Sequence, residues 1–173
     1  INFATVDMAP EVKAYIGNNT NLKVTGDVVV ASHLYATGLA EGVGVSAGLA
    51  AVGAMIAEVN LGNGNNVYGV EASLGSNSVI EANAFRISAN STDDLFADST
   101  AGSGGVIAGA GADSSVSNDN ATHVTVGDSV ITVRTMELSS INDQDIDSKA
   151  DAYTLGLLAG TGAVANNTIM SKA

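Results

Sequence analysis

The segment AYIG at residues 14–17 returns in altered form as ASLG at 72–75 and as VTVG at 124–127. In each copy a small residue and a spacer precede an aliphatic residue and a glycine. The three glycines are 58 and 52 residues apart. Self-similarity at a regular spacing is typical of repeat architectures, so it decides the fold before any single motif does.

A second element keeps nearly the same spacing. It is a Gly- and Ala-rich apolar run, and its copies are AGLAAVGA at 47–54, GVIAGAGA at 105–112 and GLLAGTGA at 156–163. The closing glycines of these runs, Gly53, Gly111 and Gly162, are 58 and 51 residues apart. Two elements with matching offsets predict one repetitive β domain over residues 1–173, with approximate copies at 12–69, 70–121 and 122–173.

The pattern inside each unit is strand-like. Residues 22–25 alternate in polarity, Gly26-Asp27 makes a turn, and the alternation resumes at 28–31. Period-two alternation of Val, Ile and Thr, interrupted by Gly-Asp or Asn clusters, is the signal of short strands. We expect the same arrangement at 79–82 and 85–89 in the second copy, and at 124–126 and 129–133 around Gly127-Asp128 in the third.

Composition favours a thin, layered core. Hydrophobic residues make up 46% of the 173 residues but aromatic residues only 4%, and there is no Trp. A repeat unit with several short strands buries its apolar face only by stacking on its neighbours, which also supply backbone partners. The sequence therefore predicts an all-β, repetitive β-solenoid resembling a parallel β-helix. Stacked antiparallel sheets in a sandwich are the alternative.

Charge excludes several function classes. The formal charge is −12, from 18 acidic and 6 basic residues, whereas phosphate binding needs clustered Lys and Arg. We therefore expect neither nucleic acid nor an anionic lipid surface as a partner. The longest apolar run, between Glu41 and Glu58, is too short for a spanning helix, so we expect no membrane insertion. Ile1 follows no basic and apolar leader, which indicates a processed or excised segment.

The chain resembles a known family over most of its length. The segments PEVKAYIGNNTNLKVTGDVVVAS at 10–32 and GLAEGVGVSAGLAAVGAMIAEV at 38–59 are similar to the long repeats of giant bacterial surface adhesins and filamentous-haemagglutinin-like exoproteins. AGSGGVIAGAGA at 101–112 is similar to the glycine-rich stretch that follows in those repeats. The third copy, ATHVTVGDSVITVRTMELSS at 121–140, keeps the spacing but not the AYIG letters.

The resemblance implies a protein exported to the bacterial cell surface, with a solenoid stalk and no catalytic residues. We expect a non-catalytic stalk or extracellular filament segment whose partners are neighbouring repeats of the same protein or further copies of itself. The alternative is a module that binds a host or surface glycan on one solenoid face. A polysaccharide lyase is the weakest reading, because Arg86 and Arg134 are the only arginines.

Few residues suggest a chemical site. His33 and His123 are the only histidines, and no H-x-x-x-H motif or cysteine accompanies them, so we interpret them as surface or satisfied core residues. No catalytic residue and no required cofactor are expected.

The acidic residues form two groups, Asp93, Asp94 and Asp98 in one and Asp143, Asp145, Asp147 and Asp151 in the other. On a strand, Asp143, Asp145 and Asp147 would share one face. Such an array can collect Ca²⁺, which takes several oxygen ligands. The simpler interpretation is a solvated acidic edge that discourages side-by-side aggregation.

Overall fold

The computed structural model describes residues 1–62 and 69–170, in which every regular element is a β-strand. A short strand, β1 (Asn2–Met8), precedes three coils of four strands each. The first coil contains β2 (Val12–Ile16), β3 (Asn21–Lys23), β4 (Asp27–Ala47) and β5 (Ala50–Leu61). The second contains β6 (Val70–Leu74), β7 (Val79–Glu81), β8 (Ala84–Gly104) and β9 (Ile107–Asn118). The third contains β10 (Thr122–Val126), β11 (Val130–Thr132), β12 (Thr135–Leu155) and β13 (Leu158–Ile169).

Each strand lies beside its counterpart in the next coil. The strand orders of the four sheets are β10-β6-β2, β11-β7-β3, β12-β8-β4 and β1-β5-β9-β13. Every strand pairing in the described residues is parallel. A full coil supplies the long crossover that parallel neighbours need. The predicted β-solenoid is therefore confirmed, and the antiparallel alternative is wrong.

The repeated glycines stack as the sequence predicts. The Gly75 N–H donates to the Ile16 carbonyl at 2.8 Å, and the Gly127 N–H donates to the Leu74 carbonyl at 2.7 Å. Ile16, Leu74 and Val126 are register partners at the preceding position. Gly17, Gly75 and Gly127 thus occupy one corner of successive coils.

The predicted alignment of the second glycine series, Gly53, Gly111 and Gly162, is correct between coils two and three. Between coils one and two it is shifted by one residue. Gly111 pairs with Gly162, whereas Gly53 pairs with Ala110. The shift arises at the corner before the long strand, where 24–26 in the first coil faces only 82–83 in the second. A one-residue difference at a corner moves every later pairing without disturbing the earlier ones.

The strands predicted at 124–126 and 129–133 are present as β10 and β11, and 124–127 aligns with 14–17 as the repeat predicts. The expectation that 124–126 also takes the place of 22–25 is wrong, because the structure pairs Leu22 with Ile80 and Ile80 with Ile131. Gly127-Asp128 therefore belongs to the corner of Gly17 and not to the Gly26 turn. Both corners carry a Gly followed by Asn or Asp, and the sequence alone does not distinguish them.

The corner after Gly17 explains a second length difference. Asn19 and Asn77 adopt positive φ angles of 56° and 57°, a left-handed conformation that Asn tolerates well. The third coil passes this corner with three residues, 127–129, where the second uses four, 75–78. The Ser129 hydroxyl donates to the Gly75 carbonyl at 2.8 Å, as the Ser78 hydroxyl of the longer corner donates to the Gly17 carbonyl at 3.2 Å, so both corners are tied to the coil below by a serine.

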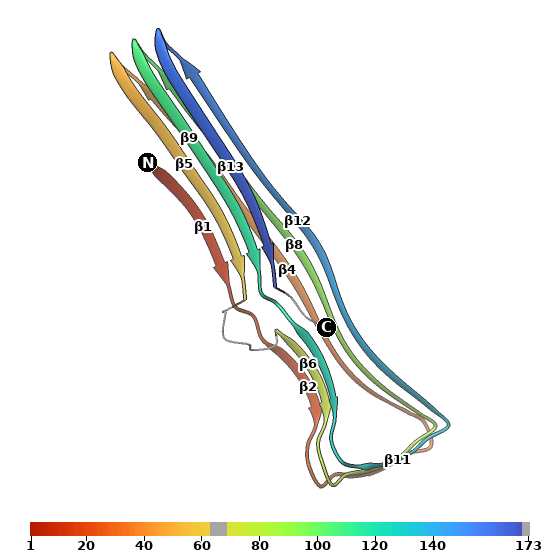
Figure 1. Ribbon diagram of the computed structural model, residues 1–173. Coiled ribbons are helices and arrows are strands. Elements are labelled where there is room, and N and C mark those ends of the chain that lie inside the picture. Colours follow the sequence, from red (N-terminus) through yellow and green to blue (C-terminus); the bar gives the residue numbers. More distant parts are fainter. Residues whose placement is uncertain (63–68, 171–173) are drawn as a thin grey trace.

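The coils have a wide end and a long, thin arm (Figure 1). The largest fully buried apolar side chains are Leu74 of β6, Ile80 of β7, Phe85, Ile87 and Leu95 of β8, and Leu61 at the end of β5. The arm consists of two facing layers, β4, β8 and β12 against β5, β9 and β13, joined by tight turns at its tip (Figure 1). Most of the fully buried large residues lie in coil two, which is covered on both sides, whereas Val59 and Leu61 of coil one lie beside Val6 and Met8 of β1.

The two layers of the arm approach closely because small residues line them. A Cβ added at Gly44 would lie 2.8 Å from the Ala54 carbonyl oxygen, and one at Gly53 would collide with the Gly102 carbonyl oxygen. Ala101, Ala110 and similar residues fill the remaining space. The Gly- and Ala-rich runs of the sequence are therefore the packing surface of the arm.

Candidate functional site

The three acids of the calcium prediction lie on the outer face of the last coil. Asp143, Asp145 and Asp147 alternate along β12, and all three are exposed. In the next strand Asp145 faces Asp94, whereas Asp143 faces Thr92. Within residues 1–62 and 69–170, no three acidic or histidine side chains are grouped so that they could hold a metal ion. The shared face is as expected, and calcium binding there stays a prediction.

The other acidic group does not form a single cluster. Asp93, Asp94 and Asp98 all lie on β8, but alternation along the strand sends Asp93 into the core and the other two outward. Asp93 is fully buried and Asp94 is exposed. The grouping by sequence proximity therefore combined an interior residue with two surface ones.

Asp93 is the centre of a buried polar network. Its Oδ1 accepts a hydrogen bond from the Ser91 hydroxyl at 2.7 Å, and its Oδ2 accepts one from Asn118 Nδ2 at 2.9 Å. The Asn120 amide donates to both carboxylate oxygens, at 3.0 and 3.1 Å. Both oxygens are thus satisfied by neutral donors, which is what a buried carboxylate needs to remain in a low-dielectric interior.

Sequence reasoning missed this network although a signal for it was present. Phe85 and Ile87 were assigned to a strand, and period-two alternation from them places Asp93 on the inward face. Asn118 and Asn120 lie at the end of β9 and just beyond it, so only the fold brings them to β8. The alternation of inward and outward positions along the strand is enough to identify Asp93 as buried, but not to identify its partners.

Ion pairs join neighbouring coils on the outer faces. Four bases stand directly opposite an acid in the adjacent coil, and the pairs are Lys13–Glu71 at 3.7 Å, Lys23–Glu81 at 2.5 Å, Arg86–Glu137 at 2.9 Å and Lys149–Asp98 at 3.8 Å. Opposite charges on directly paired strand residues favour one register over its neighbours. Four of the six bases of this acidic chain are therefore used at contacts between coils.

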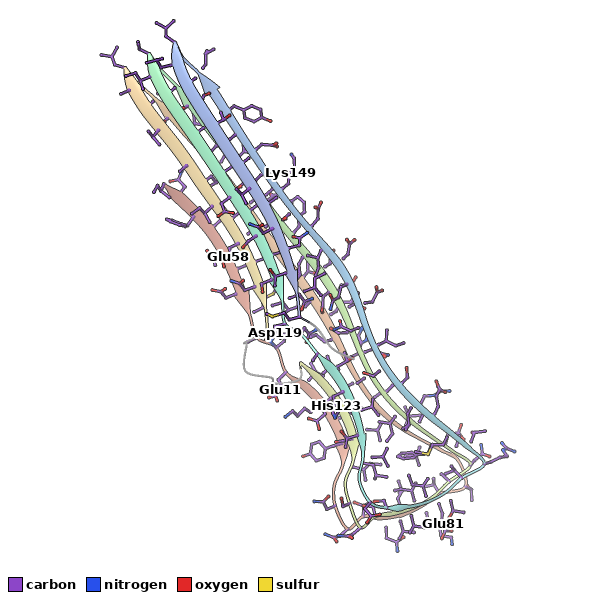
Figure 2. All side chains as sticks on the ribbon, viewed as in Figure 1. Glu11, Glu58, Glu81, Asp119, His123 and Lys149 are labelled. Atoms are coloured by element: carbon purple, nitrogen blue, oxygen red, sulfur yellow. The ribbon has the colours of Figure 1, made fainter. Side chains whose placement is uncertain are left out.

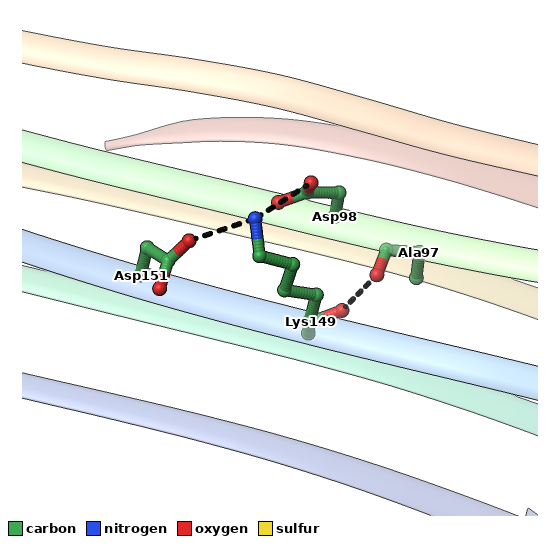
Figure 3. A network of polar contacts seen from close by, with 5 residues as sticks. Ala97, Asp98, Lys149 and Asp151 are labelled. Carbon is green, nitrogen blue, oxygen red and sulfur yellow. Dashed lines mark hydrogen bonds and ion pairs between the residues drawn. The ribbon is translucent and has the colours of Figure 1, made fainter.

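Lys149 illustrates the arrangement (Figure 3). Its Nζ lies 3.0 Å from Asp151 on its own strand and 3.8 Å from Asp98 on β8. The hydrogen bond to Asp151, followed by the negative charges of Asp151 and Asp98, raises the pKa of Lys149 above its usual 10.5. The Lys13 pKa is raised in the same way, first through its hydrogen bond to Glu11 and then through Glu71. Both amines stay charged at neutral pH.

The two histidines belong to different sheets. His33 lies on β4 beside Asn90, and His123 lies on β10 beside Glu71. Figure 2 shows His123 at the wide end of the molecule, while Lys149 and Glu58 lie along the arm. The structure does not combine the histidines into one site.

Both ends of the stack leave strand edges open. β2, β3 and β4 have no strand beneath them, and β10, β11, β12 and β13 have none above them, among the elements that the structure describes. Every residue of β13 is exposed. Unpaired N–H and C=O groups in a row form a template for a further strand. These two faces hold the longest unpaired strand edges in the described part of the chain.

No family model, no curated protein and no solved structure matches the chain. In the described ranges, no helix has the length and apolarity needed to cross a bilayer. The adhesin resemblance therefore remains a prediction, and the functional argument depends on the geometry of the coils.

Proposed function

We propose that this chain is a non-catalytic structural segment, a stalk or filament piece, of a secreted bacterial adhesin-like protein at the cell surface. The observation that supports this function is that every strand of one coil pairs along its edge with the equivalent strand of the next coil. Strands of 5, 3, 21 and 12 residues in each coil pair in parallel with the same strands of the next.

This geometry suits a load-bearing role. The backbone hydrogen bonds between strands run along the stacking axis, so a force along that axis is shared by all four ladders at once. The inter-coil ion pairs of Lys23 with Glu81 and Arg86 with Glu137 act in the same direction. Charged groups that serve coil contacts are consistent with a structural segment.

Length in such a protein comes from the number of coils. Adjacent strands lie about 4.8 Å apart, so each coil adds about that much to the stack. The 21-residue β4 spans about 70 Å across it at about 3.3 Å per residue. The segment is thus a broad, short slab, and its natural neighbours in this proposal are further coils of the same kind.

Surface labelling tests this function. Antibodies raised against residues 1–173 should label intact cells of the source organism, and gold labelling should lie outside the envelope. An antibody to a cytoplasmic protein, positive only after permeabilisation, is the control. Labelling that requires permeabilisation would overturn the proposal.

Glycan binding is a second candidate, favoured by a shallow hollow on the outer face. Lys13, Tyr15, Glu71 and Ser73 line it, and 72% of Tyr15 is exposed, so its ring is available for stacking on a sugar. The remaining exposed tyrosines, Tyr35 and Tyr153, lie on other ladders, and Tyr68 lies outside the described residues. Glycan-array binding that disappears in Tyr15→Ala and persists in Tyr153→Ala would support this candidate; an array without binding would remove it.

A further inference from the structure

The strand β1 is the outermost strand of its sheet and lies beside the C-terminal part of β5. It pairs through Asn2–Met8 with Met55–Leu61 of β5, and on its other side this part of β5 pairs with Ala112–Asn118 of β9. The latter segment pairs in turn with the end of β13, Ala163–Ile169. β1 therefore lies beside β5 on the lower side of the first coil, and residues 163–169 of β13 lie beside the equivalent part of β9 on the upper side of the second coil. The sheet containing β1 has four strands, and the other three sheets have three.

We propose that the open face of the third coil binds the first coil of a second copy of this chain, in the parallel register of the existing coils, and that β1 of the second copy restricts this contact. The inference deepens the proposed function, because it names the partner of the open coil faces. In-register stacking would put β13 of one copy directly beneath β5 of the next. Its residues 163–169 would then need the space that β1 fills, so β1 must leave for the junction to close fully.

Apolar side chains would continue across this junction. Extending the existing ladders places Ile131 over Leu22 of the second copy, because both pair with Ile80 within the chain. In the same way Val126 would lie over Ile16, since both pair with Leu74. These side chains already pack partly buried against the core. A second copy would cover the part of each that now faces solvent.

Charges also match at the junction. Lys149 and Glu41 both pair with Asp98, so Lys149 of one copy would face Glu41 of the next. Within the chain, Glu41 stands beside Asp98 and Asp94 beside Asp145, two contacts between acids. The junction repeats neither of them.

Three exposed acids of β12 would likewise face uncharged residues. The extended register places Asp143 over Tyr35, Asp145 over Thr37 and Asp147 over Leu39, because the two residues of each pair have the same register partner on β8. A chain of charge −12 therefore meets less like-charge repulsion here than in its own interior stacking. This complementarity favours a second copy over an unrelated acidic partner.

The contact is heterologous, because it joins the last coil of one copy to the first coil of another. A contact of this kind, repeated by translation along the stack, does not close and produces a growing filament. β1 then limits growth, because a first coil that is competent to bind exists only in the fraction of molecules from which β1 has detached.

The test manipulates β1 in the full chain. Val6 of β1 is partly buried against the core, and Val6→Asp should release the strand because a charge does not tolerate that environment. Conversely, Thr5 and Glu58 are register partners, and the chain has no cysteine, so a disulfide in Thr5→Cys/Glu58→Cys should hold β1 in place. Far-UV circular dichroism checks that each variant keeps its strands.

Sedimentation velocity over a wide concentration range then measures assembly. Val6→Asp should form filaments at about tenfold lower concentration than the unaltered chain, and the oxidised disulfide variant should stay monomeric and assemble on reduction. In the Val6→Asp background, Glu41→Lys should weaken assembly about two- to fivefold, and adding Lys149→Glu should restore it. Electron microscopy should show filaments with a repeat of stacked coils.

Other outcomes would overturn the inference. A folded Val6→Asp variant that remains monomeric, a closed dimer in place of filaments, or assembly indifferent to the disulfide or to the charge exchange would each contradict it. Surface labelling of cells does not depend on these results. Failure of the proposed function and failure of this junction are therefore separate findings.

Discussion

The carboxylate of Asp93 and the side-chain amide of Asn118 meet 2.9 Å apart inside the second coil, 25 residues apart in sequence. Asp93 comes from β8 and Asn118 from the end of β9, so the contact connects the two layers of the coil. Both side chains are fully buried. The network of Asp93 therefore fixes how the outgoing and returning strands of one coil are aligned, where an apolar contact would tolerate a shift.

Replacing Asp93 with Ala should destabilise the fold strongly. The Asn118 amide and the Ser91 hydroxyl would then remain buried without their acceptor, while the Asn120 amide would keep only its hydrogen bond to Ser91, and each unsatisfied group costs about 1–3 kcal/mol. Chemical denaturation followed by circular dichroism gives the change in the free energy of unfolding. Asp94→Ala, on the outer face of the same strand, is the matched control and should change stability by less than about 0.5 kcal/mol. Equal effects at both positions would contradict the buried network.

Glycine at position 53 should be essential for the arm. A Cβ there collides with the Gly102 carbonyl oxygen of the facing layer, and backbone cannot move aside as a flexible side chain can. Gly53→Ala should therefore lower the free energy of unfolding by about 1–3 kcal/mol.

Gly111 provides the control for this prediction. It lies in the same sheet, and a Cβ added there meets no atom within 4 Å. Gly111→Ala should leave the melting temperature unchanged or raise it slightly, because alanine restricts the unfolded chain. If Gly53→Ala behaved like Gly111→Ala, the close approach of the layers would not hold in solution.

Much of the fold could be predicted from the sequence because stacking repeats the same local chemistry in each coil. Gly17, Gly75 and Gly127 kept their spacing to the nearest aliphatic residue, and the strands alternated around them. Parallel pairing then followed from the need of each unit for a neighbour. The polarity of each position within a strand was also readable, including the inward position of Asp93.

The register of the later strands could not be predicted. The corner before β8 is one residue shorter than the corresponding corner of the first coil. In the sequence this difference is visible only as a shift of the later strands, so that Gly53 pairs with Ala110 and not with Gly111. The place of β1 was equally hidden, since its sequence shares little with that of its counterpart at 163–169. Contacts made by asparagines at strand ends, such as Asn118 with Asp93, depend on the completed fold.

Calcium should leave the stability of the chain unchanged. Asp143, Asp145 and Asp147 follow one another at every second residue of an exposed strand, about 7 Å apart along it, whereas two oxygens on one calcium ion lie within about 5 Å of each other. Thermal melts with calcium, with magnesium and with chelator should therefore coincide. A melting temperature that rises with calcium alone, and no longer rises in Asp145→Asn, would establish the calcium site instead.

The amine of Lys149 should titrate above 10.5, and chiefly because of Asp151. The hydrogen bond to Asp151 contributes most to the raised pKa of Lys149, and Asp98 contributes less. NMR titration of the lysine side-chain resonances should therefore give a larger fall of this pKa in Asp151→Asn than in Asp98→Asn. Because the folded-state pKa lies above the unfolded value, the stabilisation from this pairing is complete below pH 10.5 and is lost as the pH rises through the folded pKa. A pKa that falls more in Asp98→Asn would mean that the contact with the neighbouring coil, and not the one within β12, holds the charge of Lys149.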